Sequence, residues 1–222
     1  MKKNINYIFI NIMVIIVFFI YLMRPNMNTI IKTYKPIEKD EISKLKEKYN
    51  NEDIIGIINI PGVLNTPILK TTNNEFYLSH DIKKNYYKPG SVFMDYRTSF
   101  NDRKILLYGH SGDGTLPFSI LNKYLDKSFF DSNRYIYLKS SDKTYKYKII
   151  SAYIERQDFD YVNVKDFGGL SFEEHLKKLA SKSVFKTDYN INKDSKALIL
   201  QTCSLVDIGN FKFHLVVAIL ED

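Results

Sequence analysis

The stretch Ala197-Leu198-Ile199-Leu200-Gln201-Thr202-Cys203-Ser204 is a short apolar run that ends on the only cysteine in the 222 residues. An apolar run of this length, bounded by polar residues, predicts a buried β-strand. A cysteine at the open end of such a strand is held in place and can still be reached by a substrate. The alternative is a packing cysteine, because free cysteines are among the most buried residues in proteins. The rest of the chain has to decide between these two roles.

The composition favours a β-rich domain with a mildly basic surface. Hydrophobic residues make up 45% of the chain, and the aromatic residues are 17 Tyr and 15 Phe with no Trp, a bias that favours strands. The net charge of +7 is spread along the chain without an arginine-rich run. We therefore expect a surface that can lie near anionic lipid or cell-wall polymer, and no nucleic-acid partner. A single cysteine excludes an intramolecular disulfide and a multi-cysteine metal site, and we expect no metal and no cofactor.

The N-terminal segment predicts a membrane anchor. The apolar run from Tyr7 to Met23 follows Lys2 and Lys3 and contains one strongly polar residue, Asn11. It approaches the roughly 20 residues that span a bilayer, and no small-x-small cleavage site follows it. We expect a cytoplasmic tip and a single transmembrane helix over residues 1–24, with an uncleaved signal or a buried helix as the alternative. The remainder would then lie outside the cytoplasm, where thiols tend to be oxidised.

Residues 25–53 are polar and charge-rich, which predicts a juxtamembrane linker with a short amphipathic helix. From Ile54 the pattern changes to β, and residues 54–222 are expected to form one domain. Helices are expected after Pro117 and from Ser171, where Glu174 completes a capping box. About eight strands with inserted helices and no βαβ alternation predict a mostly β, mostly antiparallel closed barrel. The expected strands cover residues 54–60, 66–70, 91–96, 104–110, 135–138, 144–154, 197–204 and 211–220.

Two of these strands end on reactive residues, one on His110 and the other on Cys203. A Cys and a His from distant parts of a chain, once they meet in space, provide a thiolate nucleophile and a general acid/base. A third group must stabilise the oxyanion or orient the substrate carbonyl. Lys212 and His214 are candidates for it, because they share one face of the last strand. Each residue also has a structural alternative: His110 could be satisfied by a loop carbonyl, and Lys212 could be a solvated charge.

Several of these stretches resemble one known family. Gln201-Thr202-Cys203 after an apolar strand resembles the T-L-x-T-C signature of sortases, and Leu107-Tyr108-Gly109-His110 resembles their histidine strand. The run from Ser91 to Arg97 and the helix from Ser171 to Ser183 resemble features of class B sortases. The match covers about residues 54–220. The resemblance implies the eight-stranded closed β-barrel of that family.

The resemblance also implies an activity, that of a membrane-anchored cysteine transpeptidase of Gram-positive bacteria. Such an enzyme would cleave the C-terminal sorting signal of a secreted protein at a Thr–Gly or Thr–Asn type bond. Cys203 would form a thioacyl-enzyme, and His110 would protonate the leaving amine and deprotonate the incoming one. That amine would come from peptidoglycan or its lipid-linked precursor, with no metal needed. The residues implied in substrate binding are Thr202, Gln201, His214 and Tyr161.

Three departures from the family pattern stand out. No arginine follows Cys203, whereas the family carries one on the last strand; Lys212 is the nearest match by position and charge. A lysine keeps the charge but loses the planar two-donor fork. Gln201 stands where Ser is common, and Ser111 where Asn often follows the histidine. The missing arginine motivates an alternative, a degenerate sortase that acts as a membrane-anchored peptide-binding or scaffold module with little turnover. An unrelated cysteine peptidase is disfavoured, because here the His precedes the Cys.

Overall fold

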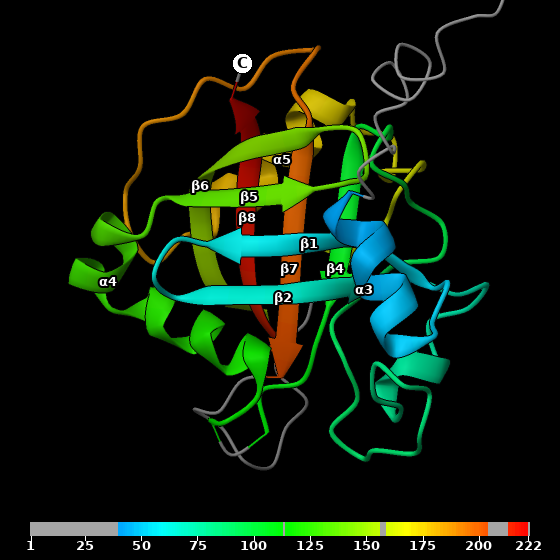
Figure 1. Ribbon diagram of the computed structural model, residues 1–222. Helices are drawn as coiled ribbons and strands as arrows, with labels where there is room; N and C mark the ends of the chain where they lie inside the picture. The colour runs from blue at the N-terminus through cyan, green and yellow to red at the C-terminus, as the bar shows by residue number, and fades with distance from the viewer. Residues whose placement is uncertain (1–39, 113, 156–158, 204–212, 222) are drawn as a thin grey trace, which may run out of the picture. The chain divides into compact units, whose positions relative to one another are not determined.

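The computed structural model of the chain describes residues 40–112, 114–155, 159–203 and 213–221 (Figure 1). Within those ranges, no helix combines the length and the apolar character needed to cross a bilayer. The anchor expected over residues 1–24 lies outside the described residues, and so does Lys212. The anchor and the role of Lys212 therefore stay predictions.

The described strands close into one barrel, in the order β1-β2-β3-β4-β7-β8-β6-β5. Most neighbours are antiparallel, as expected, but β2 pairs with β3 in parallel and β4 pairs with β7 in parallel. The second of these pairs positions the candidate site. The strands are β1 (Ile54–Ile60), β2 (Leu64–Leu69), β3 (Phe93–Met94), β4 (Lys104–Tyr108), β5 (Tyr135–Lys139), β6 (Thr144–Glu155), β7 (Ala197–Cys203) and β8 (Phe213–Glu221).

The residues of β7 alternate between two apolar cores. Leu198 and Leu200 belong to the core inside the barrel, whereas Ala197 and Ile199 belong to a second core on its outer face. Successive side chains of a strand point to opposite faces, so the apolar run at residues 197–200, at the start of β7, needs cover on both sides. This double burial explains why the sequence around the cysteine reads as a continuous apolar run.

Helical segments cover the apolar side chains on both faces of the sheet. On the outer face lies α5 (Phe172–Ser181), which packs beside β6 and begins at the expected capping box: Glu174 N donates to Ser171 Oγ at 3.2 Å, and Ser171 N donates to Glu174 Oε2 at 2.8 Å. The helix expected after Pro117 forms as a 3-10 helix, η2 (Pro117–Leu125). It packs against β2, β6, β7 and β8, and its Phe118 and Leu121 extend the inner core.

The remaining short elements correct the sequence expectations in detail. A helix that the sequence did not predict, α4 (Lys127–Ser132), follows η2 directly, with Asp126 as its N-cap. The strand expected over residues 91–96 shortens to the two residues of β3, because the chain turns at Asp95. The helix α3 (Glu41–Tyr49) matches the amphipathic helix expected before the barrel. Two further 3-10 turns are η1 (Phe76–Leu78) and η3 (Asp160–Val162).

Candidate active site

The parallel pairing of β4 and β7 brings the two reactive strand ends to one rim of the barrel. Tyr108 of β4 is in register with Gln201 of β7, and the Gly109 amide donates to the Gln201 carbonyl at 3.2 Å. His110 and Cys203 each follow this register pair by two residues. Because neighbouring strands lie about 4.8 Å apart, the two strand ends that lead to these residues lie side by side. The sequence could name both residues, but only the topology shows that their strands run in the same direction.

A close contact explains the glycine before the histidine. A Cβ atom on Gly109 would lie 2.8 Å from Cγ of Phe118, closer than two carbon atoms approach without displacement. Phe118 is fully buried in η2, so its ring has little room to move away. Gly109 thus lets η2 pack directly beneath the strand end that carries His110.

A cavity of about 290 Å³ opens beside His110. Its walls come from β3, β4, β7, β8 and the loop around η1, and they are mostly apolar with a few amide and ring polar groups. Such a pocket suits an extended peptide, whose side chains need apolar contact and whose backbone needs a few hydrogen bonds. The described lining residues are Asn74, Leu78, Phe93, Tyr108, Gly109, His110, Gln201 and Phe213.

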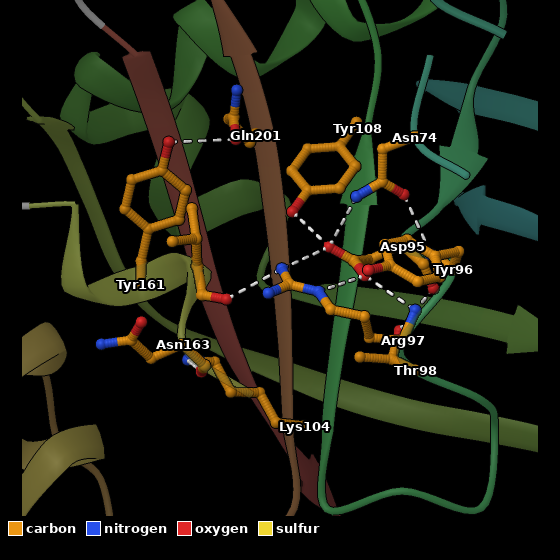
Figure 2. Close-up of polar contacts among 11 residues, drawn as sticks. Asn74, Asp95, Tyr96, Arg97, Thr98, Lys104, Tyr108, Tyr161, Asn163 and Gln201 are labelled. Atoms are coloured by element: carbon orange, nitrogen blue, oxygen red, sulfur yellow. Dashed lines mark hydrogen bonds and ion pairs between the residues drawn. The ribbon is translucent and has the colours of Figure 1, made fainter. Parts of the chain in front are cut away.

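Two of the residues implied in substrate binding contact each other. The Tyr161 hydroxyl donates to Gln201 Oε1 at 3.0 Å (Figure 2). This bond occupies the amide oxygen and leaves the amide nitrogen of Gln201 turned away from Tyr161. Tyr161 is itself buried and packs edge-on to Phe213. The Gln201 side chain, which lines the pocket, is therefore held in one orientation by Tyr161.

The other two, Thr202 and His214, lie elsewhere. They are in register across β7 and β8, both are buried, and both continue the strand faces that point into the barrel. Within the described residues, neither ring nitrogen of His214 has a hydrogen-bond partner. Burial lowers the pKa of His214 to about 4, so its ring is neutral at physiological pH. This placement argues against the predicted substrate contacts of Thr202 and His214, and against His214 as a substitute for the family arginine.

A buried carboxylate, Asp95, organises the β4 side of the pocket. It is fully buried and accepts hydrogen bonds from Tyr108 Oη at 2.8 Å and Asn74 Nδ2 at 3.0 Å. Arg97 donates two further hydrogen bonds to it, from Nε to Oδ1 at 2.9 Å and from Nη2 to Oδ2 at 2.7 Å. Burial alone would raise the pKa of Asp95, but these donors outweigh it and hold the pKa below its usual value. Asp95 therefore stays charged while it fixes two pocket residues, Tyr108 and Asn74.

Sequence reasoning missed this network and most of the pocket lining. Asn74 and Leu78 lie in a polar, aromatic stretch that carries no regular pattern. Asp95 gave a usable signal, because a carboxylate directly after the apolar run Val92–Met94 is costly to bury without partners. Such a residue predicts a buried ion pair with a nearby cation, and Arg97 is two residues away.

A buried lysine lies further along the outer face of β4. Lys104 is 2% exposed, and its Nζ lies 2.5 Å from the Asn163 carbonyl and 2.8 Å from Nε2 of His175. Burial lowers the pKa of Lys104 to about 7. In the part of the chain that is described, three or more His, Cys, Asp or Glu side chains nowhere gather in a way that could hold a metal ion.

A cysteine and a histidine after two neighbouring parallel strands of a closed barrel, with a cavity beside the histidine, are the arrangement expected of an acyl-transfer enzyme of the cysteine class. No family model matches the chain. Sortase B of Listeria monocytogenes is 31% identical over 169 residues, which covers 74% of this chain and 68% of that protein. Sortase B of Staphylococcus aureus is 28% identical over 157 residues, 69% of this chain and 64% of that protein.

Solved structures agree with these relatives. Sortase B of Clostridium perfringens superposes with a TM-score of 0.73 at 31% identity, covering 81% of this chain and 98% of that one. A Staphylococcus aureus sortase B–substrate complex superposes with a TM-score of 0.73 at 28% identity, over 83% of this chain and 87% of that one. The chain belongs to the sortase B family. It is a sortase cysteine transpeptidase, and its fold is the one that the sequence resemblance implied.

Proposed function

We propose that this transpeptidase cleaves the C-terminal sorting signal of secreted proteins and joins the protein to an amine of peptidoglycan or of its lipid-linked precursor. The observation that supports the proposal is the parallel register of β4 and β7, which brings the strand ends that carry His110 and Cys203 to one rim of the barrel, with the pocket beside His110. The apolar run at residues 7–23 supports attachment to the cell membrane through a single helix, with the catalytic domain outside the cytoplasm. That topology would place the enzyme where both substrates are found.

The proposed reaction has two acyl-transfer steps. The Cys203 thiolate attacks the carbonyl carbon of the residue before the scissile bond, and the tetrahedral intermediate collapses as the C–N bond breaks. The leaving amine takes a proton from the His110 imidazolium. An incoming amine then loses a proton to His110 and attacks the thioester, which releases the Cys203 thiolate. Protons and bonds balance over the cycle, so neither a metal nor a redox partner is required.

The pocket supports a bound peptide next to this pair. Leu78, Phe93 and Phe213 offer apolar contact, and the Gln201 amide nitrogen offers hydrogen bonds. A peptide carbonyl held by Gln201 would lie about 7 Å along β7 from Cys203, because the two residues are two strand positions apart. Gln201 would then bind the peptide beside the reacting carbonyl, while Cys203 reaches the carbonyl itself.

Peptide cleavage tests the proposal. The substrates are a set of quenched fluorescent peptides, each with a single Thr–Gly or Thr–Asn bond. We expect the wild-type chain to cleave a member of the set, Cys203→Ala to abolish cleavage, and His110→Ala to reduce it by at least about a hundredfold. Undiminished cleavage by Cys203→Ala would overturn the proposal. Addition of an amine nucleophile should convert the hydrolysis product into the transpeptidation product.

A variant series at Lys212 tests the third catalytic role. If Lys212 supplies the positive charge that the family takes from arginine, Lys212→Arg should maintain or raise kcat and Lys212→Ala should lower it. A substrate-positioning cation that gains the planar fork can bind a carbonyl with two donors. Unchanged turnover in Lys212→Ala would rule Lys212 out.

A further inference from the structure

Two walls of the peptide pocket come from distant parts of the chain. Arg97 binds a residue next to each wall: Asp95 beside Tyr108, and Val162 beside Tyr161. On one side, Tyr108 lines the pocket and donates to Asp95 at 2.8 Å. On the other side, Tyr161 donates to Gln201, which also lines the pocket. Figure 2 shows the Arg97 guanidinium between the two groups.

Arg97 makes separate bonds to each side. Its Nε and Nη2 hold the two carboxylate oxygens of Asp95 at 2.9 and 2.7 Å. The same Nη2 donates to the Val162 carbonyl at 3.0 Å, and Val162 directly follows Tyr161 in η3. The planar guanidinium fixes these directions together, because its donors form a rigid fork. The pair with Asp95 raises the pKa of Arg97, so the fork stays charged.

The turn that carries Tyr161 is bound by basic side chains from several elements. Besides the bond from Arg97 to the Val162 carbonyl, Lys104 binds the next carbonyl, that of Asn163, at 2.5 Å. At the start of the turn, Lys178 of α5 forms an ion pair with Asp160. A three-residue 3-10 turn has little stability of its own. These bonds therefore determine where the turn, and with it the Tyr161 hydroxyl, is placed.

We propose that Arg97 is a positioning residue for peptide binding: it fixes the Tyr161–Gln201 wall of the pocket relative to the Tyr108 wall. Arg97 does not line the pocket in the described residues, so it acts through Asp95 and the Val162 carbonyl. Without the fork, the turn shifts relative to β4, and the Gln201 amide loses its orientation. Removal of the Arg97 guanidinium therefore weakens peptide binding first, and it slows the chemical step only as a secondary effect. This inference rests on the proposed role of the pocket as the peptide site.

The test measures peptide affinity in the full-length Cys203→Ala protein, so that no peptide is consumed. The probe is the fluorescein-labelled form of whichever Thr–Gly or Thr–Asn peptide this parent protein binds most tightly, and the readout is the Kd from fluorescence anisotropy. Arg97→Lys keeps a charge beside Asp95 but loses the planar fork that binds both carboxylate oxygens and fixes the direction of the bond to the Val162 carbonyl. We expect this variant to raise the Kd at least about tenfold.

Arg134 provides a matched control. It is also an arginine that donates to a backbone carbonyl, with Nη2 at 2.9 Å from the Ile149 oxygen, and it packs on Phe130. Arg134→Met should lower the thermal midpoint about as much as Arg97→Lys but leave the Kd within about twofold of the parent protein. An Arg97 effect that Arg134→Met reproduces would be general loss of stability, and it would overturn the proposal.

A double-mutant cycle supplies the second measurement. Tyr161→Phe removes the hydroxyl that holds Gln201 and should raise the Kd by itself. Combined with Arg97→Lys, it should add little, because both changes release the same amide. Tyr124→Phe is the control for this cycle, because it removes a buried hydroxyl bonded to the Asn133 carbonyl at 2.9 Å, far from Gln201 in sequence. Combined with Arg97→Lys, its effect on the Kd should simply add to that of Arg97→Lys.

The outcomes separate this inference from the proposed function. Binding by the parent with an unchanged Kd in Arg97→Lys, or full additivity with Tyr161→Phe, would refute the positioning role and leave the proposed function intact. Absence of binding to every peptide by the parent protein would refute the peptide site, and this inference with it. Arg97→Met is a less suitable variant, because it leaves the buried Asp95 carboxylate without a counter-charge.

Discussion

His214 shows at the residue scale how burial can exclude a role that spacing suggests. Sequence spacing placed it with Lys212 as a candidate cation. The structure puts its ring inside the barrel opposite Thr202, where burial lowers its pKa to about 4. A side chain that is neutral and enclosed at physiological pH cannot stabilise an oxyanion as a cation. Strand periodicity identifies which residues share a face, but it does not say which face meets the substrate.

His214 should make stability depend on pH in a defined window. The ring of the unfolded chain titrates near its ordinary value of 6.5 and that of the folded chain near 4. Between these values the unfolded state holds more protons, so the free energy of unfolding falls as pH falls from about 6.5 to 4. At pH 5 the loss is about 2 kcal/mol. His214→Leu should remove it, and thermal unfolding at pH 5 and pH 7.5 measures the difference. If His214→Leu changes the stability by the same amount at both pH values, His214 is not a buried neutral ring in the folded chain.

Lys104 predicts a second window at higher pH. Its pKa is lowered from 10.5 to about 7, chiefly by burial. Between these values the unfolded chain holds a proton that the folded chain lacks, so the free energy of unfolding rises with pH. Lys104→Met removes this titration. Wild type should therefore gain stability relative to the variant as pH rises from 7 to 10, as measured by urea unfolding followed by circular dichroism. A difference that does not vary with pH would mean that Lys104 is charged in the fold.

At the scale of elements, the packing of η2 against the end of β4 decides the position of His110. Gly109→Ala should force a Cβ against the buried Phe118 ring and cost about 1–3 kcal/mol of stability. The shift should also lower kcat/KM, because His110 is the next residue. Phe118→Leu should partly rescue both quantities, since it frees space near the clash. If the double variant is no better than Gly109→Ala alone, strain at another contact is responsible.

Most elements were predictable from sequence because their signals are local. The capping box at Ser171 and Glu174 predicts the start of α5, and the apolar run at residues 197–200 predicts β7. Each signal lies in the residues that form the element. The parallel pairing of β4 and β7 was not predictable, because it depends on the path of the intervening chain. The length of β3 was overestimated for a similar reason: the turn closed by the bond from Thr98 N to the Asp95 carbonyl ends the strand, and the Asp95 carboxylate takes its partners Arg97, Tyr108 and Asn74 from other parts of the fold and from this turn.

At the scale of the whole molecule, a closed barrel was predictable from the number of expected strands, and its sortase identity from a few short motifs. The candidate site was predictable only in part. Cys203 and His110 could be named because their types carry chemistry. The pocket beside them could not, because its walls are ordinary residues that long-range packing brings together. The expected arginine substitute, Lys212, and the membrane anchor lie outside the described residues and stay predictions.

The central claim is that Cys203 becomes acylated by a peptide while His110 serves as the acid and base. Intact-protein mass spectrometry measures this most directly. Full-length wild type is mixed with a Thr–Gly or Thr–Asn peptide and quenched in acid. We expect an increase equal to the mass of the acyl fragment, located at Cys203 by fragmentation, removed by an added amine, and absent in Cys203→Ala. A wild-type protein that binds the peptide without any such adduct would contradict the account and would indicate a binding module.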